Sequence, residues 1–312
     1  MTIVKKLSFL LLIFFSFCEG SVKDRLSQIP KEDQQKLERL FRYLICNEHM
    51  GYTLWGNKPI TANEFSSGFC PAHLFSPFPH SAKLKSSMST WKKYSHLFPI
   101  KNFIFSDRMF QLETTEEWFY EVYLINKKLC DELYKKYPEI FSDGLSPEEN
   151  LIRHKGNGYQ KLGLLFGYGL HNTDSYIKMC ELQDCISHLP MPPKKSSQSI
   201  EAIQRSNLFE FKFKTLDITD PDTPVIKNPE CIDQALIVEN YLKMEKQWIS
   251  FSSYRSENRL NPVRLPVLKA DKEHEETKRL FDDYSKTRAQ LFHILKQPNF
   301  LEIVLDKLCE EL

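Results

Sequence analysis

The chain has 312 residues, of which 41% are hydrophobic and 27% charged, and its formal net charge is +1. These values are typical of a folded globular protein and exclude intrinsic disorder and collagen-like or low-complexity architecture. The near-neutral charge gives no electrostatic basis for nucleic-acid binding, which requires a basic face.

Residues 1–20 have the pattern of an export leader. Two lysines precede an apolar stretch, residues 7–17, whose length of about 11 residues suits the core of a signal peptide. A helix that spans a bilayer needs about 20 apolar residues, so this stretch is too short for one. We therefore expect an exported protein whose location is the periplasm, the envelope or the extracellular space.

The end of the leader allows three kinds of processing. Cleavage after Gly20 would release the chain, whereas Cys18 closes the apolar stretch as a lipoprotein cysteine does. Phe17 stands where lipoprotein signals usually have Gly, Ala or Ser. A leader retained as an anchor is the third alternative. In the mature chain, seven scattered cysteines are an odd number, which predicts buried thiols beside one or two disulfides.

In the first half of the chain, hydrophobic periodicity predicts an amphipathic helix over residues 30–46 and another over 82–97. Between them, residues 51–60 favour an extended segment and a turn, and 65–80 an irregular loop. Strands are expected over 102–106 and 117–126.

Helix signals follow in the middle of the chain. Residues 127–141 are expected to be helical, and Ser146 with Glu149 has the spacing of a capping box that starts the next helix. A further helix, capped by Asn172 or one of the next two residues, is expected to run to about His188.

The rest of the chain begins with a Pro/Lys/Ser segment, residues 189–199, which we interpret as a linker between regions 21–188 and 200–312. We expect the two regions to pack as one globular unit. Beyond the linker the patterns predict a strand over 209–213, a helix over 228–249, irregular structure over 250–270, a long polar helix over 272–296, and a short terminal helix after Pro298.

Half of the ten glycines lie between residues 156 and 169. The run GYGLHN is similar to a dinucleotide-binding GxGxxG, but Asn172 stands at the third glycine, so a nucleotide site is disfavoured. The preceding residues suit either a short strand or a helix in which Gly163 and Gly167 permit close helix packing. The backbone N–H groups here can also bind a small anion at a helix N-terminus. This makes Gly167, Gly169, His171 and Asn172 candidate binding residues.

The aromatic segment YTLWG adds Tyr52 and Trp55 as candidate binding residues, with completion of the core as the alternative. Cysteines and histidines lack the spacing of a zinc site and no HExxH occurs, so we expect no metal site and no cofactor. The sequence also lacks a GxSxG nucleophile elbow. A Cys/His pair that uses His154 or His171 remains the basis for an alternative function as a hydrolase or transferase.

Four blocks carry a resemblance to a family of exported, uncharacterised proteins of Chlamydia-like intracellular bacteria. GYTLWGNKP resembles YTLFGxKP, LGLLFGYGLHN resembles LGILLGYGRxN, YLINKKLCDELYKKYPEIF resembles a strand-INK-helix block, and LPVLKADKEHEETKRLFDDYSKTRAQL resembles a P-x-F…E-T-x-x-L-x-x-x-Y block. The chain departs from these patterns at Trp55, Leu170 and Leu268. The resemblance implies export and a shared fold, and it implies no activity.

Together these patterns predict a predominantly helical α+β protein with a small mixed or antiparallel sheet. The favoured function is that of a binding or host-interface protein whose partner is an unidentified protein or small ligand. Contact with a membrane is expected only through a lipid on Cys18.

Overall fold

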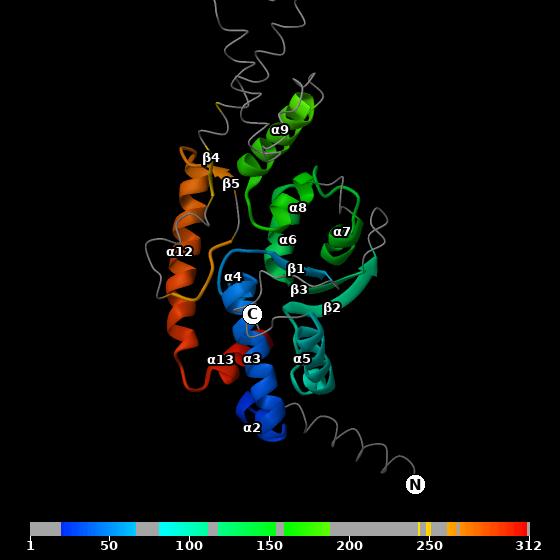
Figure 1. Ribbon diagram of the computed structural model, residues 1–312, viewed down its shortest axis with the longest axis vertical. Coiled ribbons are helices and arrows are strands. Elements are labelled where there is room, and N and C mark those ends of the chain that lie inside the picture. The colour runs from blue at the N-terminus through cyan, green and yellow to red at the C-terminus, as the bar shows by residue number, and fades with distance from the viewer. Residues whose placement is uncertain are drawn as a thin grey trace, which may run out of the picture.

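The computed structural model describes residues 20–66, 81–111, 118–153, 159–187, 243, 248–250, 261–266 and 269–310. These residues form a mostly helical α+β structure with two small antiparallel sheets, which confirms the predicted fold class (Figure 1). The leader, the linker 189–199, the strand predicted over 209–213 and most of the helix predicted over 228–249 lie outside the described residues. Among the described residues, every helix is too short or too polar to cross a membrane.

The helices and strands follow the chain in this order: α2 (Val22–Ser27), α3 (Lys31–Asn47), α4 (Met50–Leu54), β1 (Ile60–Ser66), α5 (Ser81–Tyr94), the short 3₁₀ helix η2 (Ser95–Leu97), β2 (Phe103–Gln111), β3 (Trp118–Asn126), α6 (Lys127–Lys136), α7 (Pro147–Arg153), α8 (Tyr159–Leu165), α9 (Leu170–Ser187), β4 (Trp248–Ser250), β5 (Lys269–Asp271), α12 (Glu275–Leu295) and α13 (Phe300–Cys309).

The larger sheet has the strand order β1–β3–β2, with both pairs antiparallel and β3 in the centre. Directly opposed residues share a face, so Phe105 and Leu124 lie on one face while Ile60 and Ile125 lie on the other. Both faces carry apolar side chains, because helices cover both sides of the sheet (Figure 1).

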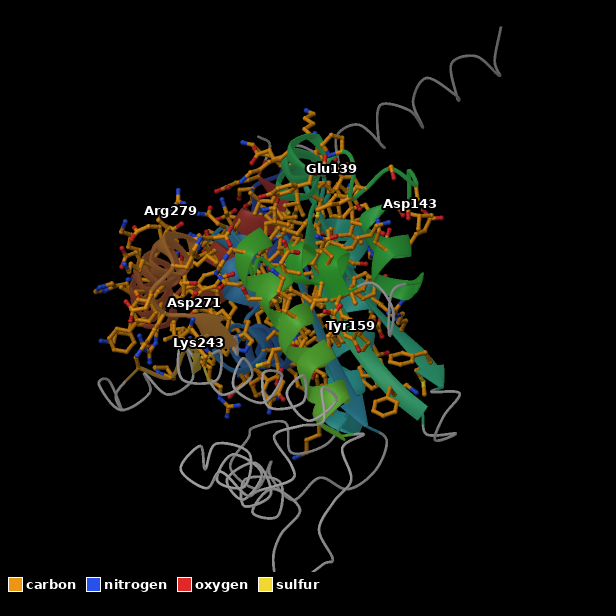
Figure 2. All side chains as sticks on the ribbon, turned by 90° about the horizontal axis from the view of Figure 1, so that it is seen from above. Glu139, Asp143, Tyr159, Lys243, Asp271 and Arg279 are labelled. Carbon is orange, nitrogen blue, oxygen red and sulfur yellow. The ribbon has the colours of Figure 1, made fainter. Side chains whose placement is uncertain are left out.

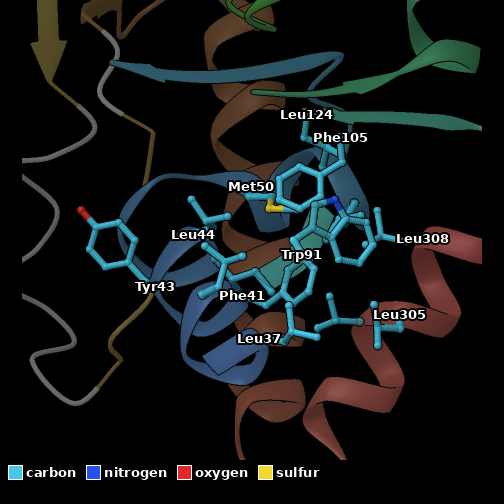
Figure 3. Packing of buried hydrophobic residues seen from close by; sticks show 14 of the residues in the cluster. Leu37, Phe41, Tyr43, Leu44, Met50, Trp91, Phe105, Leu124, Leu305 and Leu308 are labelled. Carbon is cyan, nitrogen blue, oxygen red and sulfur yellow. The ribbon is translucent and has the colours of Figure 1, made fainter. Parts of the chain in front are cut away.

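The main hydrophobic core lies on the face of the sheet that carries Phe105. The apolar positions of α3 follow the predicted helical period, and Leu37 and Phe41 are fully buried there. Figure 3 shows these two side chains packed with Trp91 of α5 and Leu305 of α13. The N-terminal helices, the sheet and the C-terminal helix therefore share one core.

A smaller cluster covers the opposite face, under α6 and α8. Ile60 and Ile125 from the sheet pack there with Cys130 of α6 and Leu165 of α8. The Asn126 side chain at the end of β3 accepts a hydrogen bond from the backbone N–H of Leu129 (3.1 Å) and so starts α6.

The capping box predicted for the next helix is confirmed. The backbone N–H of Ser146 donates to the Glu149 carboxylate (2.9 Å), and the backbone N–H of Glu149 donates to the Ser146 hydroxyl (3.2 Å). Pro147 takes the first position of α7, as the sequence indicates.

The glycine-rich segment forms a helical hairpin of α8 and α9. A Cβ atom on Gly163 would lie 2.4 Å from the hydroxyl oxygen of Thr173 in α9, so the predicted helix contact at Gly163 is confirmed. Gly167 lies in the turn after α8 and outside both helices, so the prediction that it is helical is wrong. Its close packing is confirmed, but against Tyr284 of α12.

Several predicted elements differ from the structure. The helix expected over 127–141 ends at Lys136, and strand β1 was not predicted. Thr53 and Leu54 lie in the short helix α4 and are not extended; both are buried against the core, and that packing outweighs their preference for a strand. Trp248 and Ile249 form strand β4, paired with β5, where the sequence suggested the end of a helix. The long helix expected over 272–296 is present as α12, and the break before α13 falls at Pro298 as predicted.

Candidate functional site

The turn between α8 and α9 brings together most of the residues that the sequence singled out. Gly167 and Gly169 have φ angles of 75° and 80°, in the region that favours glycine. A Cβ atom on Gly167 would lie 2.8 Å from the Tyr284 hydroxyl, and one on Gly169 would lie 2.4 Å from the Glu276 carboxyl carbon. Both glycines are therefore required for conformation and for close approach to α12.

The backbone N–H groups at the start of α9 do form an anion site, and the protein fills it with its own carboxylate. Glu276 of α12 accepts hydrogen bonds from the backbone N–H groups of Leu170 (3.1 Å) and His171 (2.8 Å). Asn172 lies inside the helix and accepts a hydrogen bond from Thr277 (2.8 Å), so the prediction that it caps α9 is wrong. The cap comes from a residue more than one hundred positions away, which no local pattern indicates.

Tyr52 is part of the core beneath this turn. Its side chain is fully buried, and its ring meets that of Tyr284 edge to face, with the centroids 5.3 Å apart. The Tyr284 hydroxyl donates to the carbonyl of Gly167 (2.8 Å). Trp55 is half-buried and packs on the same core. The structure thus places Tyr52 in the interior, the alternative reading of the aromatic segment, and a binding surface around its ring is excluded.

Sequence reasoning missed Lys58, which is 4% exposed. Its ammonium donates to the carbonyl of Phe166 (2.7 Å) and lies 5.2 Å from the ring centre of Phe166 and 5.4 Å from that of Tyr168. Burial lowers the pKa of Lys58 to about 7. The sequence gives no signal for this burial, because Lys58 stands between Asn57 and Pro59 in a short connection.

His171 lies in a polar cluster at the junction of α9, β5 and α12. Its ring stacks on His274 with the centroids 3.4 Å apart, and its Nε2 lies 3.4 Å from Asp271 and 3.5 Å from Ser175. Figure 2 shows Asp271 on the side of the molecule formed by β5 and α12. A Ser-His-Asp relay needs the acid and the serine on different ring nitrogens, so this arrangement is not one.

Three of the four thiols that the structure describes are poorly suited to nucleophilic catalysis. Burial raises the pKa of Cys46 and Cys309 to about 11 and that of Cys130 to about 12, so these thiols stay protonated at neutral pH. His154 lies outside the described residues. Within the described ranges, no three His, Cys, Asp or Glu side chains are grouped so that they could hold a metal ion.

A cavity of about 320 Å³ lies between α5, η2 and strand β2, where Phe105, Ser106 and Asp107 line it. Its apolar lining includes Trp91, Phe98 and Phe105, and the Trp91 ring packs against each of the other two. Its polar lining includes Asp107 of β2 and Lys92 of α5, whose charged groups lie 2.5 Å apart. This combination of an apolar wall and one buried carboxylate makes the cavity the candidate binding site.

No residue of this cavity was a sequence candidate. Trp91 fits the helical period of α5 and Phe105 fits the strand pattern, so both signals indicate core positions. Asp107 becomes notable only because the sheet turns it toward α5, on the same face as Phe105.

Comparison with known proteins gives no relative: no family model matches the sequence, and neither a curated protein nor a solved structure matches it. The resemblance to exported proteins of intracellular bacteria therefore stays a prediction.

The turn at Gly167 makes a prediction for stability. Gly144 has a similar φ of 68° but nothing within 4 Å of a Cβ atom, which makes it a matched control. We expect Gly144→Ala to lower the free energy of unfolding by about 1 kcal/mol, because the left-handed backbone is strained for alanine. Gly167→Ala should lower it by about 1–3 kcal/mol more, because the methyl group displaces Tyr284. Urea unfolding measures both losses. Equal losses would show that the Tyr284 contact is unimportant.

Lys58 makes a prediction for pH dependence. Its pKa is about 7 in the folded chain against 10.5 for an ordinary lysine, so between these values the unfolded chain binds the extra proton. Folding stability therefore rises with pH in that window. The free energy of unfolding of the natural protein, relative to that of Lys58→Met, should rise by about 1 kcal/mol per pH unit between about pH 7.5 and 9.5. Urea unfolding at several pH values measures this difference. A difference that does not change with pH would contradict the low pKa.

Proposed function

We propose that the protein is an exported binding protein that holds a small ligand in the cavity between α5 and β2. The observation that carries this proposal is the cavity itself. Its volume of about 320 Å³ falls in the range of natural ligand sites, and it combines three aromatic rings with a buried carboxylate. The leader, residues 1–20, supports export to the periplasm, the envelope or the extracellular space.

Binding is favoured over catalysis by the chemistry of the described groups. A Cys/His nucleophile needs a thiolate, whereas burial keeps the protonated form of Cys46, Cys130 and Cys309. At the cavity the charged groups are an aspartate and a lysine already paired with each other, which suits recognition of charge. No observation among the described residues favours the alternative of a hydrolase or transferase.

Export is tested with the full chain in a bacterial host fed a clickable fatty acid. If Cys18 is the lipid attachment site, the chain incorporates the label and Cys18→Ala loses it, while Cys46→Ala, which changes a thiol of the folded region, keeps it. If the chain is released instead, neither form is labelled and the secreted protein begins at Ser21. A full-length, unlabelled chain that stays in the cytoplasm would overturn export.

Ligand binding is tested by thermal-shift screening of the full chain against a library of small neutral, anionic and cationic aromatic compounds. Ile100 lines the cavity and is half-buried, so Ile100→Trp should fill the space. We expect compounds that raise the melting temperature of the natural chain by several degrees and have no effect on Ile100→Trp. A library without any compound of this behaviour would contradict a ligand site in this cavity.

A further inference from the structure

We propose that the cavity between α5 and β2 binds organic cations in which a primary ammonium group is attached to an aromatic or other apolar body. The ligand's ammonium replaces that of Lys92 on the Asp107 carboxylate, and its apolar body lies against the three rings. This inference rests on the proposed binding function and names the chemical class of its ligand.

The carboxylate of Asp107 is the group that selects a cation. Its side chain is 7% exposed, and its Oδ2 accepts a hydrogen bond from the Tyr120 hydroxyl (2.6 Å). Burial raises the pKa of Tyr120, so this hydroxyl keeps its proton and remains a donor. A buried carboxylate is costly unless a cation and further donors compensate it, which makes an anionic ligand unfavourable here.

The second oxygen of Asp107 is held by Lys92. Lys92 Nζ lies 2.5 Å from Oδ1 and is the only partner that the described residues give this oxygen. An ammonium is a charge-assisted donor to a carboxylate, so a ligand that replaces Lys92 must bring an ammonium of its own.

Lys92 is suited to being displaced. Its side chain is 59% exposed and sits on α5 at the rim, so its ammonium regains full hydration when it leaves. Ion pairs with exposed lysines contribute little to stability, so the cost of the exchange is small. The exchange substitutes one ammonium for another on the carboxylate, and the charge at Asp107 stays balanced.

The rings offer the rest of the ligand a small apolar contact, since Trp91 and Phe98 are each 2% exposed and Phe105 is 9% exposed. Trp91 stacks with Phe98 (centroids 6.1 Å apart) and packs against Phe105 (5.3 Å), and all three rings line the cavity (Figure 3 shows Trp91 beside Phe105). Aromatic faces attract cations as well as apolar groups. The volume of about 320 Å³ lies at the lower end of natural ligand sites, which suits a small amine with a single ring.

The test compares 2-phenylethylamine with its neutral analogue 2-phenylethanol and with phenylacetate, by calorimetric titration of the full chain. We expect the amine to bind at least about tenfold more tightly than the alcohol, because the alcohol lacks the charge-assisted hydrogen bond to Asp107. Phenylacetate should not bind, because its carboxylate would face that of Asp107. Asp107→Asn should lose the preference for the amine. Ile100→Trp should lose binding of every compound.

Lys92→Ala gives the decisive result, because it removes the exposed ammonium while Asp107 keeps its hydrogen bond from Tyr120. It removes the competing ammonium, so the amine should bind several-fold more tightly. Lys93→Ala is the control: Lys93 is equally exposed at 63% but pairs with Asp33, away from the cavity, and its loss should leave the affinity unchanged.

The outcomes separate the two proposals. If the amine and the alcohol bind alike and Ile100→Trp blocks both, the cavity binds ligands but the cation class is wrong. If Lys92→Ala weakens binding of the amine or leaves it unchanged, the exchange at Asp107 is refuted. If none of the library compounds binds in a way that Ile100→Trp abolishes, the binding function itself fails.

Discussion

The contact between α12 and the turn at residues 166–169 is the constraint on which the arrangement of the described structure depends. Tyr284 donates to the carbonyl of Gly167, and Glu276 closes the N-terminus of α9. Lys58 holds the same turn from the other side, just before β1 begins. Three parts of the chain that are far apart in sequence therefore meet through a backbone segment that only glycine allows to approach so closely.

This junction also explains why its polar groups are not a ligand site. The N–H groups that a small anion would bind are already satisfied by Glu276, and Thr277 satisfies Asn172. Inserting an anion would displace the half-buried carboxylate of Glu276 from both N–H groups, at a cost that a weakly bound ion does not offset. The cavity at Asp107 differs, because the lysine that pairs with it is exposed and can move into solvent. The exposure of the pairing group thus distinguishes a structural ion site from an exchangeable one.

The sequence was informative wherever structure is local. The period of Leu37 and Phe41 and the spacing of Ser146 and Glu149 predict α3 and the start of α7 because both depend on neighbours within four residues. Prediction from the sequence failed where contacts between residues distant in the chain determine the structure. α4 is helical because the core buries it, and α9 is capped from α12. The cavity could not be predicted for the same reason: Asp107 meets Lys92 only after β2 packs on α5.

The packing of α13 against α2 and α3 has a consequence for when the chain can fold. Arg42 donates to the carbonyl of Leu295, 253 positions along the chain, and Leu305 fills the core beside Leu37. The N-terminal helices lack this part of their core until the last helix has been synthesised. Contacts of such long sequence separation slow folding, because chain entropy is lost before they form. A nascent chain with this topology cannot complete its N-terminal core before α13 has been synthesised.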